Sequence, residues 1–170
     1  ERWFERILRI NRLTMNEEAS LQHCTDRKGV ADFYLRIDVE LSYIASSDCH
    51  NIHIRKIPKH KYSWDYLKKA NMLDDEMISY LDRNVSGYGF LISGRGGSGK
   101  STLLNNMIDQ IPYNQSVLIV QESDELYSNV HPQMQIEHVL DVKRGNEKIE
   151  YTLEDELRLG LLQDIDNFVV

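Results

Sequence analysis

The most specific chemical signal in the sequence is a glycine-rich segment, Gly94–Ser101. It reads Gly-Arg-Gly-Gly-Ser-Gly-Lys-Ser and fits the pattern G-x-x-x-x-G-K-S/T at every position. Glycines let the backbone curl so that its N–H groups point at phosphate oxygens, and a following helix adds the positive end of its dipole. Lys100 is expected to reach the β- and γ-phosphates, and the Ser101 hydroxyl to bind Mg²⁺. The segment therefore predicts a binding site for a nucleoside triphosphate with Mg²⁺.

The residue after this segment extends the predicted site, because Thr102 adds a backbone N–H and a hydroxyl near the α-phosphate. The predicted nucleotide-binding residues of the segment are Gly94, Arg95, Gly96, Gly97, Ser98, Gly99, Lys100, Ser101 and Thr102. A phosphate loop alone does not distinguish an ATPase, a GTPase or a kinase. The sequence lacks the N/T-K-x-D motif with which GTPases usually read the base, and about 90 residues precede the loop, which is unusual for small-molecule kinases.

Such a loop needs a strand before it and a helix after it. Phe90-Leu91-Ile92 predicts the strand, and a helix is expected from about Lys100 to Gln110. Val117–Val120 is a continuous apolar run, typical of a strand covered on both faces. Thr152 and Asp155 form a possible capping box for a helix ending near residue 162, and a further apolar strand begins at residue 168. These elements predict a mainly parallel sheet with helices.

The residues before the loop indicate a different architecture. We expect a helix over residues 1–21 and a polar loop over 22–32. Residues 33–41 alternate apolar and polar side chains, which predicts a half-buried strand, and residues 52–57 resume the alternation after a turn at 46–48. Two helices are expected over 63–85, capped by Ser63 and by Asp74 or Asp75.

The predicted fold is therefore α/β in two domains. Residues 1–84 form a small N-terminal α+β domain with an antiparallel sheet and linker helices, and residues 85–170 form an incomplete RecA-like P-loop domain.

Composition limits the class of protein. The chain has 170 residues, of which 41% are hydrophobic and 28% charged, as in ordinary globular domains. No stretch approaches the roughly 20 apolar residues of a membrane helix. Residues 1–83 hold 14 basic and 14 acidic residues, whereas residues 84–170 hold 6 and 13. This balance predicts no direct nucleic-acid binding, and two cysteines favour a reduced, cytosolic protein.

Two other groups of residues allow both a functional and a purely structural interpretation. A basic run from Arg55 to Lys61 is either a solvated linker or a source of phosphate ligands. Two Cys-His pairs, His23-Cys24 and Cys49-His50, lie near His53 but do not have the usual spacing of a metal site, so we expect no bound metal there. The aromatic residues Trp3, Phe4, Trp64 and Tyr66 are expected in the core or at interfaces.

Several segments together resemble the secretion traffic ATPases, the superfamily of type II and type IV secretion and type IV pilus motors. The similarity covers about residues 35–170 and is close to the branch that includes conjugation and tight-adherence pilus ATPases. It is carried by an I-R-K strand, a T-L-L-N…I-P stretch after the phosphate loop, an acidic box resembling I-E-D-T-x-E-L followed by His-Pro, and a later helix start. In this sequence these are Asn51–Pro58, Thr102–Pro112, Val120–Leu126 with His131-Pro132, and Tyr151–Leu157.

The resemblance implies a MgATP-binding motor that hydrolyses ATP and energises a secretion, conjugation or pilus machine. It further implies a homo-hexamer, located in the cytoplasm at the inner face of the cell membrane. Lys100 and Glu122 are the implied catalytic residues, with Glu122 nearest the attacking water, and Arg55 is implied to reach the phosphates from the N-terminal domain. An ungapped alignment puts Gln121 at the first carboxylate of the acidic box, whereas a one-residue deletion puts Glu122 there.

The family continues beyond a strand like residues 168–170 with a Gly-Glu pair, its second nucleotide motif, which the sequence does not contain. We therefore expect the chain to be an N-terminal domain with half a motor domain, binding nucleotide weakly and turning it over negligibly by itself. The alternative is a nucleotide-dependent regulator or partner-binding module with little or no turnover.

Overall fold

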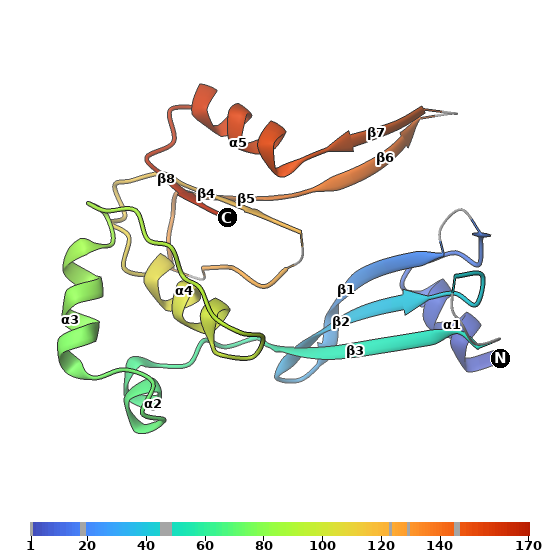
Figure 1. Ribbon diagram of the computed structural model, residues 1–170, viewed down its shortest axis with the longest axis horizontal. Coiled ribbons are helices and arrows are strands. Elements are labelled where there is room, and N and C mark those ends of the chain that lie inside the picture. The colour runs from blue at the N-terminus through green and yellow to red at the C-terminus, as the bar shows by residue number, and fades with distance from the viewer. Residues whose placement is uncertain (1, 18–19, 45–48, 123, 129, 145–146) are drawn as a thin grey trace. The chain divides into compact units, whose positions relative to one another are not determined.

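The computed structural model describes residues 2–17, 20–44, 49–122, 124–128, 130–144 and 147–170. The chain forms two compact units, residues 1–60 and residues 61–170 (Figure 1). This division lies before the two linker helices, whereas we predicted a domain boundary at 84/85. The helices belong to the second unit because their contacts are made with it.

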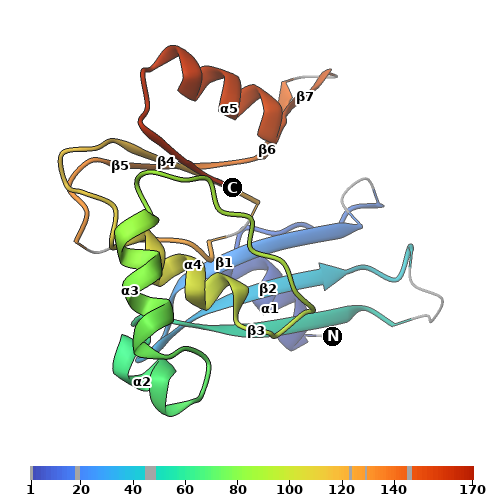
Figure 2. The same cartoon turned by 60° about the vertical axis from the view of Figure 1, so that its left-hand side comes forward.

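The first unit is a three-stranded antiparallel sheet with one helix. Strand order is β1-β2-β3, with β1 at Leu21–Val30, β2 at Phe33–Glu40 and β3 at Asn51–Pro58, and the three strands lie side by side in Figure 2. Helix α1, Arg2–Ile10, packs Phe4 and Leu8 in one core cluster with Ile37 and Val39 of β2 and with Leu41, which follows β2. The α+β prediction for this part of the chain is confirmed.

Two predictions in the first unit were wrong. Residues 22–32 are not a loop, because most of them form β1, an outer strand paired through its backbone with β2. Its side chains are largely polar and Leu21 is 73% exposed, so the strand carries little hydrophobic signal. The first helix ends at Ile10 rather than near 21, because Arg12 adopts a left-handed φ of 60° and Leu13 N donates to Leu8 O. The predicted turn at 46–48 lies outside the described residues.

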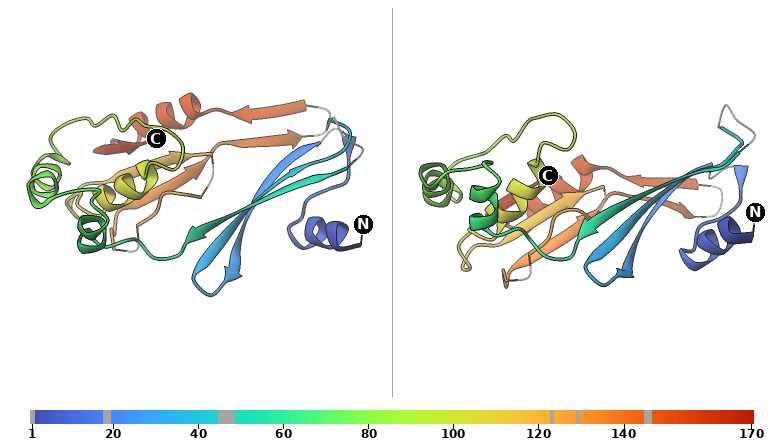
Figure 3. Two further views of the ribbon diagram at one scale, coloured as in Figure 1. Left: turned by 60° about the horizontal axis from the view of Figure 1, so that its bottom comes forward. Right: turned by 90° about the horizontal axis from the view of Figure 1, so that it is seen from below.

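The second unit contains the parallel sheet. Its strand order is β5-β4-β8, and the central strand β4, Val117–Gln121, is buried along its whole length. Strand β5 spans Met134–His138 and β8 spans Asn167–Val169, while β6, Leu140–Arg144, and β7, Glu147–Tyr151, form a separate antiparallel hairpin. Figure 3 shows this hairpin extending away from the parallel strands. The α/β prediction with a parallel sheet is confirmed.

The helices of this unit begin at the capping residues that the sequence predicts. Helix α2, Trp64–Lys69, is capped by Ser63, and α3, Asp75–Asn84, by Asp74. Helix α4 spans Lys100–Ile108, and α5, Leu153–Leu162, begins with the predicted capping box. The close approach of α5 to the sheet favours Gly160, because a Cβ there would overlap the side chains of Leu118 and Phe168.

The predicted strand at residues 90–92 is not formed. Leu91 is 95% exposed, and residues 85–92 run as irregular backbone along a cavity of about 480 Å³ that α4 and β8 also line. An apolar run becomes a strand only when a neighbouring strand pairs with its backbone. In the described part of the chain β8 pairs with β4 alone, so residues 90–92 have no strand partner.

Two carboxylates meet between β5 and α5. The side chains of Glu137 and Glu156 are hydrogen-bonded to each other. This hydrogen bond, the partial burial of Glu137 and the like charge of Glu156 raise the pKa of Glu137 to about 7. Oε2 of Glu137 is buried and has no hydrogen-bond partner in the described structure. One proton held between the two groups therefore stabilises the contact at acidic pH.

We predict that this pair makes stability fall with rising pH. Because the folded pKa of Glu137 lies above its unfolded value, its contribution is complete below pH 4.5 and is lost as pH rises through about 7. The unfolding free energy of the wild type should fall between pH 5 and pH 8. In Glu137→Gln this fall should be smaller by about 1 kcal/mol, a value that allows for solvent screening. Urea denaturation at both pH values measures this. Glu154→Gln, on the exposed side of α5, is the control, and its stability should depend on pH as that of the wild type does. If the stability of Glu137→Gln also showed the wild-type pH dependence, the prediction would be contradicted.

Candidate functional site

The glycine-rich loop forms the turn that its sequence predicts. Gly97 has a φ of 74° and Gly99 a φ of 90°, both in the left-handed region that favours glycine. Gly99 is the N-cap of α4, which begins at Lys100 as expected. Since a glycine cap has no side chain, the first-turn amides of α4 are left for another acceptor. The loop therefore ends in the positive end of a nine-residue helix.

The ammonium group of Lys100 lies within the curve of this loop. Its Nζ donates to Gly94 O at 2.8 Å and to Arg95 O at 3.0 Å, and Ser98 N closes the turn on Arg95 O at 3.2 Å. Residues 94–98 are exposed to solvent. A cation and a helix N-terminus are thus presented together at an open surface, an arrangement suited to an anion.

Ser101 lies beside a carboxylate that our sequence analysis did not select. Its Oγ donates to Oε2 of Glu125 at 3.0 Å. A hydroxyl and a carboxylate in contact supply two oxygen ligands of the kind that Mg²⁺ prefers. The only sequence signal for Glu125 was its place in the acidic segment, which also contains Glu122 and Asp124.

Gln121 holds this acidic segment in place. Its side chain is buried, its Oε1 accepts from the backbone N–H groups of Glu125 at 3.1 Å and Leu126 at 2.8 Å, and its Nε2 donates to Leu126 O at 3.1 Å. The amide therefore serves both as donor and as acceptor for the backbone. Glu122 follows β4 directly and is exposed, and its catalytic role stays a prediction.

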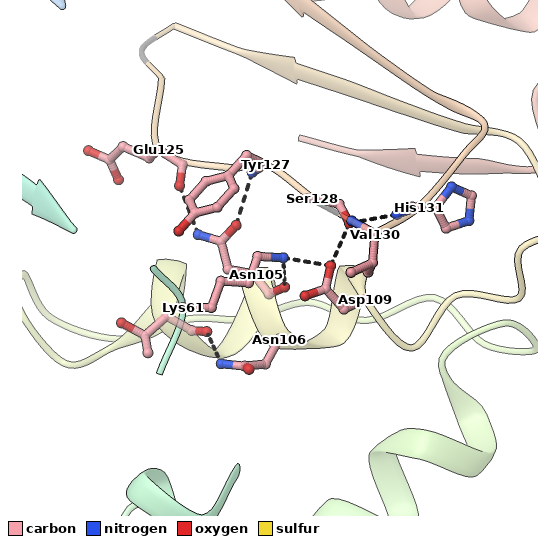
Figure 4. Close-up of polar contacts among 10 residues, drawn as sticks. Lys61, Asn105, Asn106, Asp109, Glu125, Tyr127, Ser128, Val130 and His131 are labelled. Atoms are coloured by element: carbon pink, nitrogen blue, oxygen red, sulfur yellow. Dashed lines mark hydrogen bonds and ion pairs between the residues drawn. The ribbon is translucent and has the colours of Figure 1, made fainter. Parts of the chain in front are cut away.

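Asn105 on α4 joins the helix to the same segment from the other side (Figure 4). Its Nδ2 donates to Glu125 O at 2.8 Å, and its Oδ1 accepts from Tyr127 N at 3.0 Å. On the same helix, Asn106 Nδ2 donates to the carbonyl of Thr102 at 3.0 Å. The helix that begins at the phosphate loop is thus bonded to the backbone around Glu125.

Lys61 and Asp109 form a half-buried ion pair at the far end of α4. Lys61 Nζ lies 2.7 Å from Asp109 Oδ1 and donates to Asn105 O at 2.6 Å. Burial lowers the pKa of the Lys61 ammonium, against the opposite effect of Asp109. Asp109 also accepts from Ser128 Oγ at 2.6 Å, and that hydroxyl accepts from the backbone N–H of His131 at 3.1 Å. The network fixes the remainder of the acidic segment to α4.

The other sequence candidates lie in the first unit. Arg55 is on β3 and exposed, and its contribution to phosphate binding stays a prediction. His50 accepts from Ser42 N through Nδ1 and stacks on Phe4 with ring centroids 4.6 Å apart. Among the described residues, no group of three His, Cys, Asp or Glu side chains is arranged to hold a metal ion.

We predict that Gln121→Glu destabilises the protein. The substitution removes the Nε2 donor and places a carboxylate against Leu126 O, leaving a buried acceptor unpaired. The expected loss of unfolding free energy is about 2 kcal/mol, measured by urea denaturation. Glu122→Gln, at the neighbouring exposed position, should change stability by less than about 0.5 kcal/mol. Unchanged stability of Gln121→Glu, with faster ATP turnover, would instead identify position 121 as a catalytic carboxylate site.

The chain was compared with solved structures, with curated proteins and with sequence models of protein families. The solved structure of the VirB11 ATPase from the Brucella suis type IV secretion system, in complex with sulphate, matches 94% of this chain and 52% of its own, with 15% identity and a TM-score of 0.43. The chain thus spans about half the length of that protein. No curated protein sequence matches it. None of the described helices has both the length and the apolar character to cross a membrane. The sequence model of the family described as Type II/IV secretion system protein matches residues 30–170, and the chain belongs to this family.

Proposed function

We propose that the chain binds MgATP through residues 94–102 and that, in the complete protein, it hydrolyses ATP to drive a secretion, conjugation or pilus machine. The proposal is carried by one observation, the start of α4 at Lys100 directly after a loop with two left-handed glycines. The ammonium of Lys100 and the first-turn amides of α4 converge at this point, where the phosphates would bind. Family membership supports the assignment to secretion ATPases.

Each residue has a defined role in this proposal. The loop amides and Lys100 hold the phosphate oxygens and stabilise the charge that develops during phosphoryl transfer. Ser101 and Glu125 would hold Mg²⁺, which would supply positive charge against the phosphates. Glu122 orients the attacking water, and Arg55 is a further proposed phosphate ligand, because a guanidinium can make two parallel hydrogen bonds to phosphate.

The proposed setting follows from the family. We infer that the complete protein forms a homo-hexamer at the cytoplasmic face of a secretion or pilus membrane complex, and that exchange of ATP for ADP changes its conformation. A second candidate is a nucleotide-dependent regulator or partner-binding module with little turnover. This candidate is favoured by Gln121, which occupies the position where an ungapped alignment places a carboxylate. The side-chain amide of Gln121 makes hydrogen bonds to the backbone of Leu126 through both its oxygen and its nitrogen.

We predict that Lys100→Ala weakens MgATP binding by about 10- to 100-fold without unfolding the protein, because one charge-assisted contact to phosphate is lost. Isothermal titration with MgATP measures the affinity, and circular dichroism checks the fold. Lys69→Ala, an exposed lysine at the end of α2, is the matched control and should bind as the wild type does. Equal affinity of Lys100→Ala and wild type would refute the phosphate-loop assignment.

A second pair of variants separates the two carboxylates. Glu125→Gln should weaken MgATP binding several-fold while leaving the affinity for metal-free ATP the same or higher, because it removes a charge proposed to face the cation. Glu122→Gln should leave both affinities unchanged and lower kcat in the complete protein. Titrations with and without Mg²⁺, followed by phosphate-release assays, distinguish the two roles. A Mg²⁺-independent effect of Glu125→Gln would assign Glu125 to structure alone.

A further inference from the structure

Helix α3 borders a mainly apolar groove of about 440 Å³ at the surface of the second unit, which we call the α3 groove. Its lining consists of Leu73, Asp74, Glu76, Met77, Tyr80, Leu81 and Leu103. Met77 is 52% and Tyr80 57% exposed, and α3 has no buried residue along its ten positions. Aromatic rings and methionine side chains are enriched where proteins bind one another. The groove therefore has the composition of a protein-binding surface.

The α3 groove has an acidic edge. Residues 74–83 hold four carboxylates and one arginine. Two of the carboxylates have local roles, because Asp74 is the N-cap of α3 and Asp75 pairs with Lys68 at 2.9 Å. Glu76 lines the groove, and in the described part of the chain its side chain makes no hydrogen bond or ion pair. A partner that matches this surface is therefore apolar and basic.

Helix α1 has an exposed side of this kind. Phe4 and Leu8 belong to the core of the first unit. Trp3, Arg6 and Ile10 lie within about 60° of one another around the helix, on the side away from that core. Trp3 and Ile10 are each 63% exposed. Tryptophan and arginine are the residue types that contribute most often to binding energy at interfaces.

The charges of α1 are opposite to those beside the groove. Residues 2–12 hold four arginines and one glutamate. Arg9 lies in the last turn of α1, where the helix dipole favours a cation, whereas Arg6 lies in the middle of the helix. Arg6 is exposed, and within the described residues its side chain makes no hydrogen bond or ion pair. Arg6 and Glu76 are thus opposite charges without a local partner, one on each surface.

The two surfaces also agree in length. Trp3 and Ile10 are seven residues apart, which is about 10 Å along a helix. Asp74 and Leu81, which line the groove from the N-cap of α3 onward, are separated by the same number of residues. One side of α1 can therefore lie along the groove.

We propose that the α3 groove of one copy of this chain binds the exposed side of α1 of a second copy, with Arg6 facing Glu76. Trp3 supplies the large apolar side chain that the groove encloses, and the charges at its edge fix the register. Both surfaces are present on every copy. A second copy is therefore a partner with the required shape, apolarity and charge.

This contact joins two different surfaces, so it is head-to-tail. Repeated head-to-tail contacts close into a ring when the rotation between copies allows it. The inference rests on the homo-hexamer of the proposed function and names a contact within it. It does not require bound nucleotide, because none of residues 94–102 lines the groove.

Sedimentation velocity of the intact protein over a range of concentrations measures the contact. The wild type should associate as concentration rises, and Trp3→Ala and Tyr80→Ala should each weaken association by about tenfold or more. Both side chains are exposed, so neither variant should unfold the protein, and circular dichroism checks this. Tyr66→Ala removes a 53% exposed tyrosine on α2 and is the matched control, which should associate as the wild type does.

An exchange of charges identifies the two surfaces as partners. Arg6→Glu and Glu76→Arg should each weaken association by about tenfold, because each brings like charges together. An equal mixture of the two variants should associate more tightly than either alone, because one supplies an unchanged groove and the other an unchanged α1. Lys69→Glu, at an exposed position of α2, is the control for reversing a charge and should have no effect.

Loss of association in the single variants, with recovery in the mixture, supports the proposal. A wild type that stays monomeric would overturn it, and so would wild-type association of Trp3→Ala and Tyr80→Ala. A loss confined to Tyr80→Ala would assign the groove to a different partner. A mixture without recovery would show that Arg6 and Glu76 do not meet.

The same measurements keep this proposal separate from nucleotide binding. Lys100→Ala should associate as the wild type does, and Trp3→Ala should bind MgATP as the wild type does in isothermal titration. Failure of the phosphate-loop assignment would therefore leave the contact between copies in place. Assembly through this contact into a species other than a hexamer would support the contact and contradict the proposed hexamer.

Discussion

The side-chain amide of Asn105 is the contact on which the geometry of the candidate site depends. It satisfies one carbonyl and one N–H of the segment after β4, at Glu125 and Tyr127, and it is itself almost fully buried. Burying such backbone groups without partners would cost about 1–3 kcal/mol each. Because Asn105 follows the phosphate loop on one continuous helix, the distance between that loop and Glu125 is set by a rigid element. The hydroxyl of Ser101 meets a carboxylate as a result.

Much of the fold could be predicted wherever the determining interactions are local. The caps at Ser63, Asp74 and Thr152 each bond to a backbone N–H within three residues, so a short stretch of sequence contains the whole interaction. The same holds for the alternation of β2. Strand β1 was missed because its side chains are largely polar, whereas its pairing with β2 is made by the backbone. The segment 90–92 shows the converse, since apolar residues alone do not make a strand.

In the candidate site, too, the parts formed by local contacts could be predicted and the parts formed by distant contacts could not. The loop and the start of α4 follow from Gly97, Gly99 and Lys100, whose neighbours in sequence are also their neighbours in space. The contact between Ser101 and Glu125 could not be predicted from the sequence. It depends on Gln121, four residues before, and on Asn105, twenty residues before, which together turn the chain after β4. An alignment treats Gln121 as a replaced carboxylate, whereas its buried amide makes hydrogen bonds that a carboxylate cannot make.

The charge distribution sets a condition on any anion that binds here. Residues 84–170 hold all of the net charge of −7, so the overall field of this part of the chain opposes a polyphosphate. Attraction must come from the loop amides, the helix end and Lys100, which act at short range. A phosphate oxygen about 4 Å from the Glu125 carboxylate would be repelled by about 4 kcal/mol at an effective dielectric of 20. A divalent cation between the two groups reverses the sign of that interaction. A carboxylate placed 3.0 Å from the Ser101 hydroxyl therefore makes sense in a site for a metal–nucleotide complex, and would be a disadvantage in a site for a free phosphate.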